Sequence, residues 1–479
     1  MKTPVREPLP CPRRSTTGNQ TYTGNVTLST GAVTLTGATP TFGGTIVGGG
    51  QDLTLNFLGT TALNGANHTG IAALTTGGGG TTTLTGTITT SGAQTYNDSV
   101  TLAGDTTLTS TSNAAITFTS TIDDPTLIAS NSLTITGTSP VTFGGAVGTV
   151  FPIDGLTTGG STLINGGFIS AAGFQSYGGL ATLGANTVIR TGPATFSGGL
   201  AGGGFDLTLD LSAASTFVGA NFTGIRNLTI GRNGQSNPTT LSGAVTTSGT
   251  QTYDDPIILG ANTTLVSTGS GSAGNITFNS TVNASTGGTE TLTVNTSGTT
   301  TFGGAIGLGS NGVYEAGGGD DKYLSALTTD AGGGTTISGG TIFAEGITFN
   351  DTVTLGTGTV ILGSGTHEFM ATSAILGGGN SLTLSGGGTT RIGGNVSGLS
   401  TLTSDGGGTT TFGLAAGAVA VTVTTTGFQV YKDAIVLDQT TTLTGTSVTS
   451  FTTTISAPGT MSIATGVNGS KNLTVNITP

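Results

Sequence analysis

The chain has 479 residues, of which 88 are Gly and only 7% are Asp, Glu, Lys or Arg; it has no Trp, and its formal net charge is −11. So low a charge content excludes a fold of amphipathic helices, and it does not match disordered chains, which are charged and poor in β-branched residues. No apolar run approaches the length of a transmembrane helix, and Gly lacks the three-residue period of collagen. An all-β chain of Thr, Val and Ile with Gly turns is therefore expected.

The first residues, MKTPVREPLPCPRRS, differ in composition from the rest. They are interrupted by four prolines and are not followed by the apolar stretch of a signal peptide. Residues 1–17 are therefore expected to be a disordered or artefactual lead-in. The single Cys11 allows no internal disulfide. The rest of the chain has too few basic residues for a nucleic-acid surface, so no nucleic-acid partner is expected.

Six copies of one motif follow at intervals of 74 to 96 residues. The first copy reads GNQTYTGNVTL, and every copy has an aromatic residue followed by apolar residues four and six positions later. The aromatic positions are Tyr22, Tyr96, Tyr177, Tyr253, Phe349 and Tyr431. Offsets of zero, four and six lie on one face of a strand, so all six rings are predicted to be buried. Because one copy has Phe349, this slot is expected not to depend on the tyrosine hydroxyl.

Each repeat unit also contains further short strands and no helix-period segment. A second signature, Thr-Phe-Gly-Gly, begins at Thr41, Thr142 and Thr301. Repeats without clear domain boundaries favour a solenoid, in which each coil packs on its neighbours. We expect a parallel β-helix (β-solenoid) forming a single elongated rod, with about four coils of about 20 residues per unit and roughly 23 coils in all. The expected units are residues 18–91, 92–172, 173–248, 249–345, 346–426 and 427–479.

The iterated QTY-x-D-x-VTL, with TTLTS, NITF and TTTFGGA, resembles the repeat region of filamentous-haemagglutinin-like bacterial exoproteins over residues 18–479. These are two-partner-secretion adhesins, and autotransporter passenger β-helices are similar to them. The resemblance implies a right-handed parallel β-helix that acts as a non-enzymatic adhesin or filament shaft and presents binding loops for attachment, aggregation or biofilm. It also implies an extracellular or bacterial outer-surface location, a transporter in the outer membrane, and a surface glycan or protein as receptor. Self-association along or end-to-end of the rod is a further expectation.

Residues capable of chemistry are few. His68 and His367 are too far apart in a solenoid to share a metal site or triad, so each is expected to be an exposed turn or surface residue. Adjacent acids occur at Asp123-Asp124, Asp254-Asp255 and Asp320-Asp321. Neighbouring strand residues face opposite ways, and two of these pairs precede Pro, so solvated turns are expected. A weak calcium site and glycosidase-like catalysis are the alternatives.

The longest insertion, Ser310 to Tyr323, is the candidate ligand loop, because specific binding usually resides in loops that project from a regular scaffold. We predict no catalytic, cofactor-binding or metal-binding residues, no cofactor and no enzymatic activity. Glycosylation is left open by Asn-x-Ser/Thr sequons at Asn25, Asn67, Asn221, Asn227, Asn275, Asn279, Asn350 and Asn472.

Two other functions compete with adhesion. Thr-x-Thr elements at Thr34–Thr36, Thr134–Thr136 and Thr291–Thr293 suggest an ice- or crystal-binding solenoid. That function requires the pairs to align on one flat face, coil after coil, and their irregular spacing argues against it. A carbohydrate-active enzyme is the third class, since some parallel β-helices cleave polysaccharides.

Overall fold

The computed structural model describes residues 13–29, 31–231, 237–308, 322–370, 373–404, 407–414, 420–445, 447–451, 455–456 and 461–465. The chain is all-β, with 57% strand and 2% helix, and its parallel coils stack into a β-solenoid of about 19 turns. The predicted fold class, a parallel β-solenoid, is confirmed.

The turns vary in length more than the sequence suggested, and many of them are longer than 20 residues. Residues paired on successive turns are 18 apart at Gly334 and Thr352, 21 apart at Leu53 and Leu74, and 35 apart at Thr299 and Gly334. The expectation of roughly 23 coils of about 20 residues was therefore wrong, because loops at the corners lengthen many turns.

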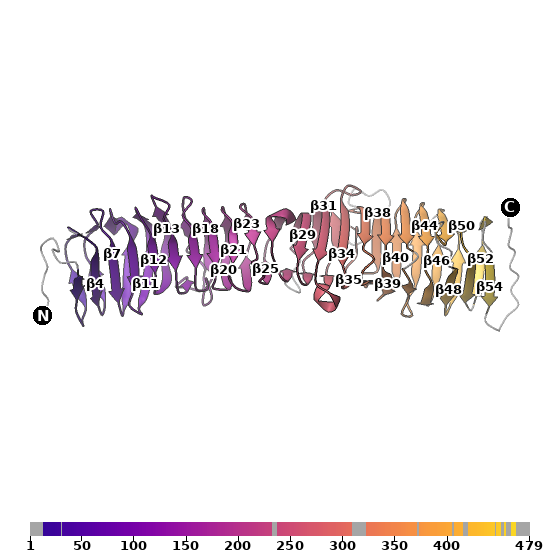
Figure 1. Cartoon of the computed structure of the whole chain (residues 1–479), viewed down its shortest axis with the longest axis horizontal. Coiled ribbons are helices and arrows are strands. Elements are labelled where there is room, and N and C mark those ends of the chain that lie inside the picture. The colour runs from indigo at the N-terminus through magenta and orange to yellow at the C-terminus, as the bar shows by residue number, and fades with distance from the viewer. Residues whose placement is uncertain are drawn as a thin grey trace. The chain divides into compact units, whose positions relative to one another are not determined.

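Unit 1, one of two compact units, comprises Met1–Phe217 and Asn221–Arg226, and strand pairing gives each of its turns three faces. Figure 1 labels many of the strands. The first face holds β1 (Arg13–Ser15), β4 (Val33–Gly37), β7 (Leu53–Phe57), β10 (Leu74–Gly77), β12 (Gln94–Tyr96), β14 (Ile116–Phe118), β17 (Val141–Phe143), β19 (Thr162–Ile164), β21 (Ala181–Leu183), β24 (Leu200–Ala201) and β27 (Phe222–Thr223). The second and third faces hold β2 (Gln20–Tyr22), β3 (Val26–Thr27), β5 (Pro40–Phe42), β6 (Ile46–Val47), β8 (Thr60–Asn64), β9 (His68–Thr69), β11 (Thr81–Thr90), β13 (Ser99–Ser110), β15 (Ile122–Asp123), β16 (Leu133–Ile135), β18 (Ile153–Thr158), β20 (Phe168–Tyr177), β22 (Thr187–Thr191), β23 (Ala194–Phe196), β25 (Leu207–Leu211) and β26 (Ser215–Val218).

Unit 2, which comprises Val218–Ala220 and Asn227–Pro479, repeats this plan. Its first face holds β28 (Leu228–Ile230), β30 (Gln251–Tyr253), β32 (Ile276–Phe278), β35 (Thr299–Phe302), β37 (Gly334–Ile337), β39 (Thr352–Leu355), β42 (Ile375–Leu376), β45 (Val396–Leu399), β48 (Val421–Thr425), β51 (Thr441–Gly445) and β54 (Met461–Thr465). The second and third faces hold β29 (Thr239–Thr247), β31 (Ile257–Ser267), β33 (Val282–Ala284), β34 (Thr291–Thr296), β36 (Leu324–Thr329), β38 (Thr341–Phe349), β40 (Thr359–Leu362), β41 (Thr366–Phe369), β43 (Leu382–Ser385), β44 (Thr389–Ile392), β46 (Leu402–Ser404), β47 (Thr409–Phe412), β49 (Phe428–Tyr431), β50 (Ala434–Leu437), β52 (Ser447–Phe451) and β53 (Ile455–Ser456). Short 3₁₀ turns occur at η1 (Gly65–Asn67), η2 (Gly219–Asn221) and η3 (Gly271–Gly274).

The solenoid begins before the expected boundary at residue 18. β1 pairs in parallel with β4, and Arg13 is the register partner of Thr34. The expectation of a disordered lead-in is therefore wrong for Arg13–Ser15, since the backbone of β4 can pair with any sequence in extended conformation. Residues 1–12 lie outside the described part of the chain.

Inward side chains form columns in which like residues lie above one another. All six predicted slot rings are buried, none more than 3% exposed, which confirms that prediction. Rings on the following turns continue the stack: Phe118 lies 5.0 Å from Tyr96 between ring centroids, and Phe143, from the second signature, lies 5.7 Å from Phe118. In unit 2, Phe278 lies 5.0 Å from Tyr253 in the same way. The two signatures thus contribute rings to one aromatic stack, with Phe118 and Phe278 between them in these two copies.

A buried glutamine accompanies each tyrosine of the slot. The tyrosine hydroxyl donates to Oε1 of the Gln two residues earlier, over 2.6 to 2.8 Å in all five copies. Nε2 of Gln251, for example, donates to the carbonyls of Val245 and Val266, the latter on the next turn. The Phe349 copy has Ile347 in place of Gln. The expectation that the slot is independent of the hydroxyl was therefore wrong for the tyrosine copies.

The sequence repeat does not correspond to a whole number of turns. In unit 1, Tyr96 lies on the first face, whereas Tyr177 lies on the third, stacked over Thr158. The 81 residues between them therefore cover three turns and two further faces, slightly fewer than the expected four coils, so the motif returns on a different face. In unit 2, Tyr253 lies on the first face and Phe349 on the third. The move from one copy of the motif to the next is therefore again three turns and two faces.

Candidate functional site

One corner of unit 1, between its second and third faces, carries loops of unusual length. In β13 this corner consists of Ala103–Asp105, and the strand continues through it. In the next turn the chain leaves β15 and returns at β16, so residues 124–132 form the corner. One turn later, Val147 pairs with Ile122, and residues 148–152 lead into β18. Two loops therefore project from neighbouring turns at one edge.

Asp124 holds the first loop in shape. Its side chain is 1% exposed and accepts hydrogen bonds from the amide and hydroxyl of Thr126, both 2.9 Å, and from the amides of Ser130 and Asn131, at 3.3 and 3.0 Å. The side chain of Asn131 adds another at 2.9 Å. Burial raises the pKa of Asp124, but these hydrogen bonds together outweigh it and hold the pKa below its ordinary value. The loop is thus organised around an ionised carboxylate.

The loop presents aliphatic side chains to solvent. Leu127 and Ile128 are each 82% exposed, and Val150 on the second loop is 68% exposed. Asp123 fixes the second loop by accepting from the amide of Val150 over 2.9 Å. On the following turn, the exposed ring of Phe174 lies over Gly155, where a Cβ would come within 2.7 Å of the ring. We call Leu127, Ile128, Val150 and Phe174 the corner patch.

Carboxylates border the corner patch. The amide of Ser132 donates to Asp105 over 2.9 Å, and its hydroxyl donates to Asp154 over 3.2 Å. Asp105 is exposed, and Asp123 and Asp154 are half-buried. The sequence contains no Lys or Arg between Arg14 and Arg190. The patch is therefore an anchored apolar surface in a uniformly acidic part of the chain.

Sequence reasoning did not find this patch, although one signal was present. In DDPTLIASN, Leu127 and Ile128 are adjacent within a segment marked as a turn by Pro125. Two neighbouring apolar residues cannot both face inward from an extended chain. The adjacent acids and Pro125 indicate a polar turn, so Leu127 and Ile128 were not expected to form an apolar surface.

The adjacent acids differ from that expectation. In each described pair the second carboxyl is buried: Asp124 and Asp255 are each 1% exposed. Asp255 lies against Gly231, where a Cβ would be 2.3 Å from its Cγ. The solvated-turn expectation was wrong for these two residues, because side chains at corners fold inward. Asp254 instead accepts from Asn279 over 2.6 Å. Asp320-Asp321 lies outside the described residues.

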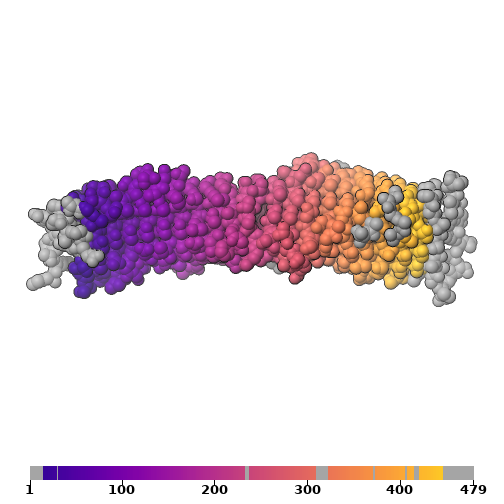
Figure 2. Space-filling view, viewed as in Figure 1, coloured from indigo at the N-terminus to yellow at the C-terminus, as the bar shows by residue number. Residues whose placement is uncertain are grey.

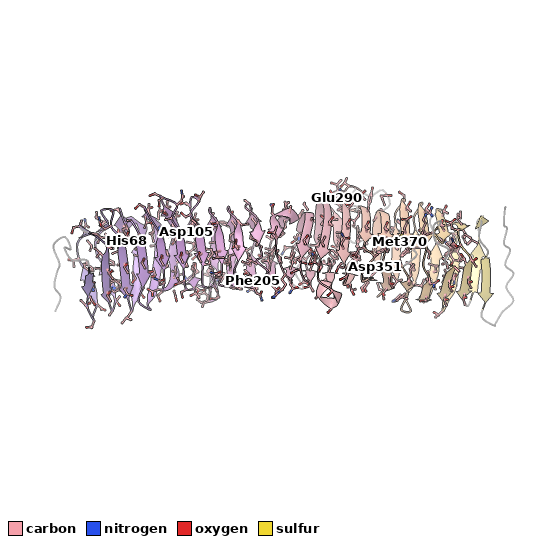
Figure 3. All side chains as sticks on the ribbon, viewed as in Figure 1. His68, Asp105, Phe205, Glu290, Asp351 and Met370 are labelled. Atoms are coloured by element: carbon pink, nitrogen blue, oxygen red, sulfur yellow. The ribbon has the colours of Figure 1, made fainter. Side chains whose placement is uncertain are left out.

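The two histidines are buried as well, so the expectation that they would be exposed was wrong. Nδ1 of His68, which is labelled in Figure 3, lies 2.6 Å from the carbonyl oxygen of Asn64. Nε2 of His367 lies 3.2 Å from the carbonyl oxygen of Ala344. Burial, opposed in part by these hydrogen bonds, lowers the pKa of both rings. They belong to different units. Among the described residues, no group of three or more His, Cys, Asp or Glu is placed to hold a metal ion.

Most of the candidate ligand loop, Ser310 to Tyr323, lies outside the described residues. Its described end is anchored: Lys322 donates to the carbonyl of Ser285 over 3.1 Å, and Tyr323 stacks on Phe343 with centroids 4.6 Å apart. The neighbouring turn is held by Glu290, which accepts from the hydroxyl of Ser285 over 2.7 Å (Figure 3). Burial raises the pKa of Glu290, but its hydrogen bonds outweigh this and lower it overall.

Threonines form long columns on the outward faces. One column on the first face of unit 1 runs through six successive turns, and another on the first face of unit 2 does the same. Their members are Thr34, Thr54, Thr75, Thr95, Thr117 and Thr142, and Thr229, Thr252, Thr277, Thr301, Thr336 and Thr354. Thr-x-Thr pairs also align on three turns of the third face of unit 1, at Thr87–Thr89, Thr107–Thr109 and Thr134–Thr136. The irregular spacing along the sequence is absorbed by corner loops.

Several sequon asparagines have structural partners. The side chains of Asn25, Asn227 and Asn275 accept from backbone amides on the next turn, at 2.8 to 2.9 Å. Asn67 and Asn221 are exposed at the 3₁₀ turns. Asn472 lies outside the described residues.

Comparison with known proteins gives no relative from which a function could be transferred: no protein-family model, curated protein or solved structure matches this chain. No helix in the described ranges is both long and apolar enough to span a membrane. On the face drawn in Figure 2, the described surface of each unit is closely filled by side chains without a deep hollow. The corner patch and the Thr columns are therefore the surface features on which a functional proposal can be based.

Proposed function

We propose that the chain is a non-enzymatic adhesin or filament shaft of the filamentous-haemagglutinin-like type, located at the bacterial outer surface or secreted. The observation that carries the proposal is the corner patch, in which several anchored aliphatic side chains project together from a solenoid whose outward faces carry long threonine columns. Patches of exposed apolar residues mark interaction sites in soluble proteins. The repeated QTY motif and its resemblance to exoprotein repeats support an exported shaft that crosses the outer membrane through a transporter.

Attachment of coated beads to cells tests this function. Beads carrying the wild type, the double variant Leu127→Ser/Ile128→Ser or the control Leu58→Ser are offered to bacterial and animal cells. Leu58 is 72% exposed but lies between β7 and β8, away from the corner. The wild type and the control are expected to attach, and the corner variant is expected to attach about tenfold less, as loss of an interface centre does. Failure of all beads to attach, or equal attachment of all three, would contradict the proposal.

The Thr columns favour a second candidate, binding to ice or another crystal surface. Supporting it, the pairs at Thr107–Thr109 and Thr134–Thr136 lie on successive turns of one face, whereas Thr34–Thr36 lies on another face of unit 1. However, the hydroxyls of Thr109 and Thr136 are 2.8 Å apart and hydrogen-bond each other, which reduces what they can offer to a lattice. Thermal hysteresis at micromolar protein separates the candidates: appreciable activity would place this function first, and none would exclude ice.

A further inference from the structure

We propose that the partner of the corner patch is a protein segment in which Lys or Arg residues flank aliphatic side chains. This inference rests on the proposed function and specifies the receptor. The partner is expected to carry aliphatic side chains because Leu127, Ile128 and Val150 are highly exposed at one corner. In the described part of unit 1, only the isolated Leu58 is an aliphatic side chain of similar exposure. Because Asp124 already fixes their loop, little conformational freedom is lost when they are covered.

The partner is expected to carry Lys or Arg because the residues around the patch are acidic. Between Arg14 and Arg190 the sequence has six carboxylates and no Lys or Arg. Asp105, Asp123 and Asp154 lie at the corner itself. The next cations along unit 1 are already engaged: Arg190 pairs with Asp210 over 2.8 Å, and Arg226 pairs with Asp206 over 2.7 Å. The charge at the corner is therefore left for a partner to complement.

The same features disfavour other occupants. A second copy of the chain would bring identical carboxylates together, and an anionic bilayer would be repelled by them. A glycan is disfavoured because the most exposed side chains of the patch, Leu127, Ile128 and Val150, are aliphatic and offer neither hydrogen bonds nor an aromatic face. Aliphatic tips within an acidic border fit a cationic, aliphatic peptide surface best.

The test uses the full chain and a labelled 12-residue peptide of alternating Lys and Leu, followed by fluorescence anisotropy. Saturable binding is expected, with the Kd raised about tenfold by Leu127→Ser/Ile128→Ser and unchanged by Leu58→Ser. Asp105→Asn and added salt should each weaken binding, since both reduce the electrostatic contribution. Peptides of alternating Glu and Leu, or Lys and Ser, should bind at least tenfold more weakly.

Each contrary result overturns the inference. Equal binding of the Glu–Leu peptide would show an apolar site without charge selection, and an unchanged Kd in the corner variant would place the site elsewhere. Binding to phosphatidylcholine vesicles that is lost in the corner variant would assign the patch to lipid, and concentration-dependent self-association lost in that variant would assign it to a second copy. If no peptide binds while coated beads still attach to cells through the corner, the adhesin function stands and this partner class fails. Native hydrogen exchange at Ser130 and Asn131 confirms that each variant keeps its loop.

Discussion

The buried Gln–Tyr pair shows how a single residue choice depends on its neighbour. In five copies the tyrosine hydroxyl donates to a Gln on the same face, and in the sixth both partners change together, to Ile347 and Phe349. A buried acceptor without its donor destabilises a fold, whereas replacing both groups by apolar ones is much less costly. The pair therefore behaves as one unit of the core.

Reciprocal substitutions test this coupling. Tyr253→Phe leaves Oε1 of Gln251 without its 2.7 Å donor, and Phe349→Tyr directs a hydroxyl at Ile347; each is expected to cost about 1–3 kcal/mol in the free energy of unfolding. Phe349→Tyr combined with Ile347→Gln should recover part of that cost, as coupled neighbours do. Chemical denaturation of the variants measures the changes. If the double variant is no more stable than Phe349→Tyr alone, the pair does not act as a unit.

Sequence alone predicted the burial of these rings, because a strand has a period of two residues. It did not reveal the use of the hydroxyl, although Gln and Tyr two positions apart must share a face. Phe349 by itself indicates only that the slot accepts a ring, whereas Ile347, two positions earlier, shows that the Gln is replaced together with the Tyr. Burial of Asp255 was beyond such a pattern, because corner residues follow no fixed period and their direction is set by the turn on which they pack. His68 is buried for another reason: it lies in the two-residue strand β9, in register with Ile46 of β6.

Asp351 in unit 2 leads to a pH prediction. Burial, moderated by hydrogen bonds from Thr335 and Thr329 and reinforced by nearby Asp330, raises its pKa to about 6. Since an unfolded Asp has a pKa of about 3.9, the folded state binds the proton more tightly, so the stabilisation is complete below about pH 4 and is lost as pH rises through 6. Asp351→Asn, which keeps an acceptor for both threonines, should stabilise unit 2 by on the order of 2 kcal/mol at pH 7.5.

The measurement is denaturant unfolding of wild type and Asp351→Asn at pH 5 and pH 7.5. The advantage of the variant should be smaller at pH 5, where the wild-type carboxyl is largely protonated. Asp210→Asn serves as the control, because Asp210 lies in unit 1 and pairs with Arg190 at the surface. An Asp351→Asn advantage that does not change with pH would contradict the assigned cause.

At the scale of elements, the aromatic stack joins strands that are distant in sequence. Phe118 of β14 is packed between Tyr96 of β12 and Phe143 of β17. Phe118→Ala removes both ring contacts and leaves a cavity, so it is expected to cost about 3–5 kcal/mol. Hydrogen exchange should quicken in β12, β14 and β17 and stay unchanged in unit 2, because a solenoid turn packs only on its neighbours. Thr117→Ala, on the outward face of the same strand, is the matched control; equal effects of both changes would refute the stack as a stabilising element.

At the scale of the whole chain, the fold could be predicted and its periodicity could not. Composition and repeats were sufficient to identify parallel stacked coils, since no other all-β architecture fits so many Gly corners without hairpins. The number of turns and the relation of repeat to turn depend on corner loops such as residues 124–132, whose length is visible in the sequence only once the strands on either side are placed. A solenoid with three similar faces also permits a repeat that ends on a different face from the one on which it began.

Because a repeat can end on a different face from the one on which it began, unit 1 is expected to tolerate some deletions and not others. Removing residues 92–172 joins Ser91 to Gly173, so that Gln175 and Tyr177 take the places of Gln94 and Tyr96 and every inward residue still faces inward. The variant should fold cooperatively and lose three turns and two faces, shortening the stack by about 18 Å at roughly 4.8 Å per turn, as small-angle scattering would detect.

Removing residues 99–172 instead joins Asp98 to Gly173 and places Tyr177 at the outward position of Ala103, which reverses the inward alternation. This control should lose strand signal and expose apolar surface. Equal folding of both deletions would mean that register along the columns does not determine stability, and unfolding of both would mean that the solenoid is not a sum of nearest-neighbour turns.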